Sequence, residues 1–148
     1  MAADLSQENL RHSLLTFPEF HAAADTLFIA EGLLMYLRAE MVDGIFRIVR
    51  HHAGARSRFA FTFLEPQAGG RVNFRNVSRW VDLWLRLRGE TFLWGIRCEE
   101  LPRYLETRGF RPRDLATADT FRHRYLQTDD LRDSALAEGE CLCVAEYN

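Results

Sequence analysis

The stretch DTLFIAEGLLMYL, Asp25 to Leu37, decides how this chain folds. It contains TLFIAE, Thr26 to Glu31, a continuous apolar run of strand length. Such a run is typical of a strand buried on both faces, as in a parallel sheet under helices. The run ends in Glu31 and Gly32 follows it, so a carboxylate lies at the carboxyl end of the predicted strand, where open α/β sheets bind ligands. Gly32 permits a close backbone approach there. On spacing alone, Glu31 is equally consistent with a strand-end acid that caps the next turn.

The residues on either side of this stretch predict further regular elements. Apolar residues recur at helical spacing from Arg38 to His52, which predicts a helix. FAFTF, Phe59 to Phe63, is the next run of strand type. Strand, helix and strand together predict a βαβ crossover with parallel strands. Upstream, the sequence predicts a short helix from Ser6 to Thr16, which Pro18 ends.

The second half of the chain predicts a helical insert and a closing pair of strands. We expect helices over 77–87 and 99–108 and a short helix or loop over 118–126. We also expect an extended or irregular segment over 89–96 and strands over 110–115 and 140–147. Gly109 is placed to end the second of these helices. The long stretch between the last two strands is consistent with an antiparallel pair at a sheet edge. No linker or repeat divides the chain, so we expect one α/β domain over 1–148.

Composition excludes several classes of function. The net charge is −2 and the acidic residues are spread along the chain, which argues against binding nucleic acid. The apolar runs are far too short for a membrane span, and the start of the chain has no signal-like pattern, so we expect a cytoplasmic protein. Of the three cysteines, Cys141 and Cys143 form a C-x-C pair without a second pair, a weak zinc signal. We expect small buried side chains there and no metal site.

Four segments resemble the leucine carboxyl methyltransferase family, in the family's order along nearly the whole chain. DTLFIAEGLLMYL is similar to the family's fourth strand and its cofactor-facing loop. AADL, Ala2 to Leu5, resembles the acidic–aliphatic pair beside the cofactor's adenine. GETFLWGIRCEELPRYLETRGF, Gly89 to Phe110, looks like bacterial relatives grouped as polyketide-type O-methyltransferases. GECLCVAEY, Gly139 to Tyr147, is similar to the family's closing strand.

The resemblance implies a Rossmann-like, class I methyltransferase fold that binds S-adenosylmethionine (SAM). Asp4 and Leu5 match the pair that contacts the adenine, with Asp4 the acceptor for its exocyclic amine. Glu31 matches the acid that lines the SAM pocket, and Gly32 and Tyr36 lie in the same loop. An alternative for Tyr36 is an aromatic ring packed on the following helix.

The resemblance also implies transfer of a methyl group to an oxygen atom. The acceptor is a carboxyl or hydroxyl group of a small molecule or a peptide. Trp94 and Arg97 fall in the segment that would border the acceptor pocket, and Arg97 could pair with an acidic substrate. A carboxylate acceptor needs no general base, so the five scattered histidines carry no predicted catalytic role.

One part of the family pattern has no match. The family's glycine-rich loop, roughly G-x-G-x-D-T-R, and the acid after its second strand would hold the cofactor from the other side. We therefore expect the carboxyl-terminal half of the fold. Two hypotheses follow. In the first, the chain is a methyltransferase polypeptide, either a piece of a longer enzyme or a half that pairs with a separately encoded amino-terminal half. In the second, it is a truncated, inactive remnant that binds a protein partner.

Overall fold

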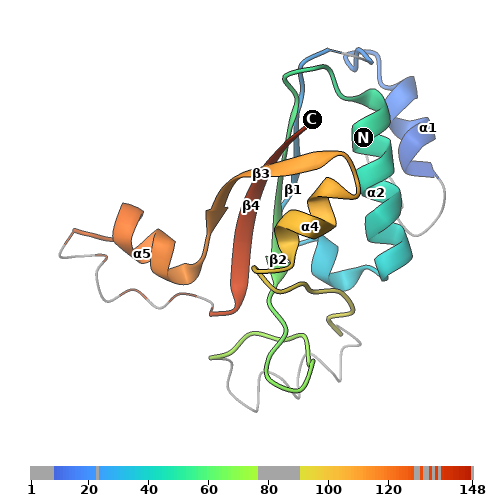
Figure 1. Ribbon diagram of the computed structural model, residues 1–148. Coiled ribbons are helices and arrows are strands. Elements are labelled where there is room, and N and C mark those ends of the chain that lie inside the picture. The colour runs from blue at the N-terminus through green and yellow to red at the C-terminus, as the bar shows by residue number, and fades with distance from the viewer. Residues whose placement is uncertain are drawn as a thin grey trace.

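The structure is a computed structural model that describes residues 9–22, 24–76, 91–128, 131, 134, 136 and 138–147. Four strands and five helical segments follow one another along the described residues (Figure 1). Their order is α1 (Asn9–Thr16), β1 (Leu27–Ala30), the 3-10 turn η1 (Leu34–Tyr36), α2 (Ala39–His52), β2 (Arg58–Leu64), α4 (Leu101–Glu106), β3 (Phe110–Ala116), α5 (Ala118–Tyr125) and β4 (Glu140–Tyr147). The helix predicted over 77–87 lies outside the described residues.

The strands form one mixed sheet in the order β1-β2-β4-β3. β1 and β2 are parallel, in a register that pairs Phe28 with Phe59, and α2 connects them. This arrangement confirms the predicted crossover. β4 lies antiparallel to both β2 and β3, which places β3 at the edge of the sheet. The predicted closing pair of strands is therefore also confirmed.

The helices begin and end close to the predicted residues. α2 starts at Ala39 after an extended Arg38 and runs to His52. α4 is shorter than predicted, and Gly109 follows it with a φ of +81°, as its role in ending the helix requires. None of the helices within the described residues is long and apolar enough to cross a membrane.

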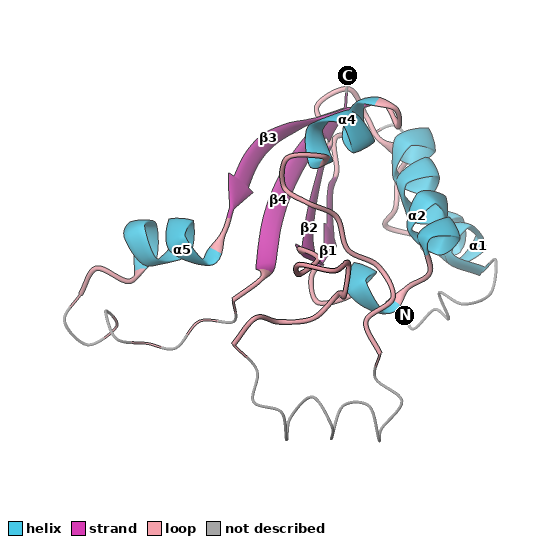
Figure 2. Cartoon of the chain, turned by 60° about the horizontal axis from the view of Figure 1, so that its bottom comes forward, coloured by secondary structure: helices cyan, strands magenta, loops and turns pink. Residues whose placement is uncertain are grey.

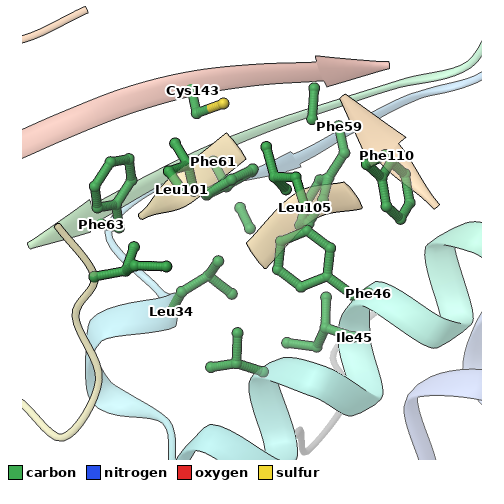
Figure 3. Packing of buried hydrophobic residues seen from close by; sticks show 14 of the residues in the cluster. Leu34, Ile45, Phe46, Phe59, Phe61, Phe63, Leu101, Leu105, Phe110 and Cys143 are labelled. Atoms are coloured by element: carbon green, nitrogen blue, oxygen red, sulfur yellow. The ribbon is translucent and has the colours of Figure 1, made fainter. Parts of the chain in front are cut away.

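Aromatic side chains fill the core between α2 and the sheet. The ring of Phe46 on α2 lies 5.1 Å from Phe59 and 5.4 Å from Phe61, both on β2, between ring centroids. It also lies 5.7 Å from Tyr104 on α4 and 5.6 Å from Phe110 on β3. Figure 3 shows Phe46 of α2 beside Phe59 and Phe61 of β2 and Phe110 of β3. Edge-to-face contacts of this kind add to the free energy gained by burial.

The prediction that β1 is buried on both faces was wrong. Phe28 packs against the core and Ala30 is buried, but Leu27 is 58% exposed and Ile29 is 67% exposed. In the described part of the chain, β1 pairs with β2 alone and forms the other edge of the sheet. α1 and α2 lie together on one side of the strands in Figures 1 and 2. The apolar run is therefore that of a sheet edge with one uncovered face.

Candidate functional site

Two carboxylates follow the two parallel strands. Glu31 comes directly after β1 and Glu65 directly after β2, so both lie at the carboxyl edge of the sheet. Glu31 is exposed, whereas the Glu65 side chain is 25% exposed. The carboxyl edge is where open α/β sheets place ligands. The prediction that Glu31 lies at the carboxyl end of a parallel strand is therefore confirmed.

The turn that carries Glu31 is held to β2 by one side chain. Gly32 has a φ of +59°, in the left-handed region that favours glycine, and the space where a Cβ would point is open. Its backbone N–H donates a hydrogen bond to Thr62 Oγ1 at 2.8 Å. Thr62 is 6% exposed. The turn therefore leaves room for close approach to the backbone while one of its amides is already satisfied.

Residues 91–96, here called the strap, cross this edge of the sheet. The carbonyl of Met35 in η1 accepts hydrogen bonds from the amides of Leu93 at 2.7 Å and Trp94 at 3.2 Å. At the other end, the amide of Ile96 donates to the carbonyl of Leu64 at 3.1 Å. The strap thus joins the loop after β1 to the end of β2. Residues 91–96 form neither a helix nor a strand, apart from an isolated bridge between Gly95 and Leu64, which agrees with the extended or irregular segment predicted over 89–96.

A row of aromatic rings lies along the strap. The rings of Tyr36 and Phe92 are 5.2 Å apart, and those of Phe92 and Phe74 are 5.4 Å apart, between centroids. Tyr36 is 40% exposed. Its ring therefore packs on the strap and still faces solvent, which differs from the alternative of packing on the following helix.

The two residues predicted to border an acceptor lie in different surroundings. Trp94 is 6% exposed, belongs to the hydrophobic core and lies 5.7 Å from the ring of Tyr104. Arg97 is exposed, with its Nη1 3.5 Å from Glu99 Oε1 in an ion pair open to solvent. Such pairs are weak, so Arg97 can exchange this partner for another anion.

Asp4 and Leu5, predicted to contact the adenine, lie outside the described residues. The structure therefore brings together Glu31, Gly32 and Tyr36 in one loop and places the strap beside them.

Glu65 was missed by the sequence analysis. Its carboxylate accepts a hydrogen bond from the amide of Cys98 at 3.0 Å and forms an ion pair with Arg75. Burial alone would raise the pKa of Glu65, but the Cys98 amide and the Arg75 guanidinium outweigh it and keep the pKa below its ordinary value. The signal was available, because Glu65 follows its predicted strand closely, as Glu31 follows the strand before.

The thiols nearby are weak nucleophiles. Cys98 Sγ lies 3.4 Å from Cys141 Sγ, and both cysteines are free. Burial raises the pKa of each thiol, which keeps both protonated at neutral pH. Cys141 and Cys143 are buried in the core, as predicted. Across the described ranges, no group of three or more histidine, cysteine or acidic residues is arranged to hold a metal ion.

Known proteins resemble this chain in sequence. Residues 1–50 match the sequence model of the family described as leucine carboxyl methyltransferase. Over 135 residues the chain is 30% identical to a Mycobacteroides abscessus protein named "Putative S-adenosyl-L-methionine-dependent methyltransferase". The matching region covers 82% of this chain and 42% of the relative. The chain therefore spans less than half of that relative's length.

Solved structures resemble it in fold. Burkholderia thailandensis 1,6-didemethyltoxoflavin-N1-methyltransferase, solved with 1,6-didemethyltoxoflavin and S-adenosylhomocysteine, matches with a TM-score of 0.54 and 11% identity. That match covers 86% of this chain and 46% of the other. TnmH matches with a TM-score of 0.51 and 17% identity over 86% of this chain and 32% of its own. The likeness confirms the predicted α/β fold class, and the chain shares its fold with part of each of these two structures. The predicted resemblance is also confirmed: residues 1–50 are similar to the leucine carboxyl methyltransferase family.

Proposed function

We propose that this chain forms the carboxyl-terminal part of a SAM-dependent O-methyltransferase. The observation that carries the proposal is the Glu31–Gly32 turn, held at the carboxyl edge of two parallel strands with the strap beside it. This is the place where an α/β sheet of this class binds its ligand. Glu31, Gly32 and Tyr36 would form one wall of the cofactor site. Asp4 and Leu5 would reach its adenine.

The residues of the turn fit such a cofactor. Glu31 offers an exposed carboxylate, which suits an ammonium or hydroxyl group, and Gly32 offers open space where a side chain would otherwise stand. When bound, SAM supplies the activated methyl group, so the protein contributes position and electrostatics. The chain's own part is to hold the cofactor at this edge and present the acceptor beside it.

The strap is the proposed acceptor side. Tyr36 and Phe92 form an aromatic surface beside the Glu31–Gly32 turn. Arg97 lies just beyond the strap, in a weak, solvent-exposed ion pair with Glu99. An arginine in that position suits a carboxylate on the acceptor. Either a carboxyl or a hydroxyl oxygen could receive the methyl group. A small molecule or a peptide could carry it.

The second wall of the site is proposed to come from a separate segment. The chain spans 42% of its relative, and the outer edge of β1 has no neighbouring strand among the described elements. A separately encoded amino-terminal half with the glycine-rich loop would pair with that edge. Leu27 and Ile29, both more than half exposed, would then be covered.

The same exposed strand supports a second candidate, an inactive remnant that binds a protein partner. An uncovered apolar strand edge offers backbone groups and side chains to any added strand. The two candidates agree on the surface and differ on whether SAM binds.

Calorimetric titration with SAM separates them. The chain is titrated alone and again with the polypeptide encoded immediately upstream, if that frame reads G-x-G-x-D-T-R. Binding that appears or strengthens after complementation supports the enzyme. A stable monomer that binds no SAM in either preparation supports the remnant and contradicts the proposed function.

A further inference from the structure

Thr62 lies on β2, beside the point where the chain leaves β1. β1 ends at Ala30, which pairs with Phe61 on β2, and the next residue of β2 is Thr62. Beyond Ala30 no further backbone pair of β1 continues the ladder. The Thr62 hydroxyl oxygen accepts the Gly32 N–H instead, at 2.8 Å. A side chain thus continues the attachment of β1 to β2 past the end of the strand.

This attachment is protected from solvent at its β2 end. Thr62 is 6% exposed, so water has little access to its hydroxyl group. Gly32 itself is exposed, so losing this bond replaces a fixed side-chain partner of its N–H with mobile water. Gly32 holds a left-handed conformation, with a φ of +59°, and Glu31 directly precedes it. The path of the backbone at Glu31 therefore depends on the bond to Thr62.

We propose that Thr62 is a positioning residue that fixes the Glu31 carboxylate for the cofactor. The inference rests on the proposed function, because it gives Glu31 a ligand to meet. Thr62 does not touch that ligand itself. It acts through the Gly32 amide, which sets the turn before the cofactor arrives and so lowers the ordering cost of binding.

The first test compares SAM affinity among variants, in whichever preparation binds SAM. Thr62→Val keeps the shape of the side chain and removes the acceptor oxygen. We expect about ten-fold weaker binding. Thr62→Ser restores the oxygen and should recover most of the affinity. The matched control is Thr26→Val at the opposite end of β1, where the hydroxyl bonds to the carbonyl of Ala24, and its affinity should equal that of the wild type.

The second test asks whether Thr62 acts through Glu31. In a double-mutant cycle, Thr62→Val is combined with Glu31→Gln. If Thr62 positions the carboxylate, its loss weakens binding much less once the charge of Glu31 is gone. Equal losses in both backgrounds would mean that Thr62 supports the fold in general and would overturn the inference.

Amide hydrogen exchange gives a readout without any ligand. In the chain alone, the Gly32 amide should exchange faster in Thr62→Val than in the wild type, Thr62→Ser or Thr26→Val. Unchanged exchange in Thr62→Val contradicts the inference. The two proposals fail in different ways. A wild type that binds no SAM contradicts the proposed function. A Thr62→Val variant that binds SAM as tightly as the wild type contradicts the positioning role of Thr62.

Discussion

The carbonyl of Met35 accepts a hydrogen bond from the amide of Leu93 at 2.7 Å, and this bond joins the loop after β1 to the strap. Met35 itself is buried, at 2% exposed, so the carbonyl belongs to a well-packed element. Two parts of the proposed site that lie far apart in sequence are thereby held to each other. A change that displaces the strap should also disturb the loop that carries Glu31.

Gly95→Ala should displace the strap. A Cβ built on Gly95 would lie 2.4 Å from the carbonyl oxygen of Leu64, which is backbone of β2, and 3.0 Å from a methyl group of Val72. The backbone must shift to relieve this contact, so we expect a loss of about 1–3 kcal/mol in the free energy of unfolding. This loss is measured by urea denaturation, monitored by circular dichroism.

Gly44→Ala is the matched control. Gly44 lies inside α2, and a Cβ there meets no atom within 4 Å. Alanine is the better helix former, so this variant should gain about 0.5–1 kcal/mol. If Gly95→Ala unfolds at the same urea concentration as the wild type while Gly44→Ala behaves as expected, the strap is not held as described.

Much of the fold was predictable because local patterns and tertiary contacts agree. The helical spacing from Arg38 to His52 and the FAFTF run gave α2 and β2 nearly residue for residue. The faces of β1 could not be predicted, because an apolar run does not reveal how many neighbours its strand has. Leu27 and Ile29 have the composition of a central strand, yet in the described sheet they belong to an edge.

A polar cluster clamps α2 to α4, and Tyr104→Phe should weaken it. The Tyr104 hydroxyl donates to Asp43 Oδ1 at 2.9 Å, while Arg108 Nη2 donates to the same oxygen at 2.6 Å and the Arg108 guanidinium lies 3.4 Å from the centre of the Tyr104 ring. Burial, with the bond to Asp43, raises the pKa of Tyr104. Removing the hydroxyl should cost about 1 kcal/mol in thermal or urea unfolding.

Asp43→Ala should cost more, about 1.5–3 kcal/mol, because it leaves the half-buried Arg108 without its carboxylate. The comparison is Arg56→Ala, which removes the ion pair with Asp25 at 2.8 Å on a surface where the Arg56 side chain is 88% exposed. That change should cost less than about 0.5 kcal/mol. Equal effects of the two alanine variants would contradict the clamp.

His52 should make stability depend on pH. It is 5% exposed at the end of α2, and within the described residues its Nε2 has no hydrogen-bond partner. Burial lowers the pKa of His52, and the charges of His51 and Arg11 lower it further. Below about pH 6.5, His52 therefore binds a proton more readily in the unfolded chain than in the folded chain. As a result, the free energy of unfolding falls as the pH drops below this value.

Thermal unfolding between about pH 7.5 and 5.5 measures this effect. His52→Phe should flatten the pH dependence, since it removes the titrating group from its apolar contact with Phe20. His123→Gln, at an exposed position on α5, should leave the dependence unchanged. If the stability of His52→Phe depends on pH as strongly as that of the wild type, the pH dependence comes from another group.

Ile29→Lys should reduce self-association of the isolated chain. Ile29 is 67% exposed on an edge strand, and such edges invite pairing with another chain. Sedimentation or light scattering should show oligomers for the wild type and a shift toward monomer for the variant. Tyr125→Lys, which replaces a 62% exposed aromatic on α5, should not change the oligomeric state. A monomeric wild type would contradict the prediction.

The site was partly predictable for a different reason. Glu31 and Gly32 could be placed at the edge of the sheet because an apolar run followed by an acid and a glycine marks the carboxyl end of a strand. The hydrogen bond between Met35 and Leu93 could not be predicted, because a bond between two loops depends on how the sheet brings them together. The burial of Trp94 depends on the same packing.

The central claim is that Glu31 lines a SAM site, and calorimetric titration of Glu31→Ala against the wild type tests it most directly. Both are titrated in the preparation that binds SAM, with circular dichroism to establish that the variant is folded. We predict that SAM binds the wild type and that its affinity for Glu31→Ala falls by about ten-fold or more, the loss of one charge-assisted hydrogen bond. Equal affinity in the two proteins would contradict the account.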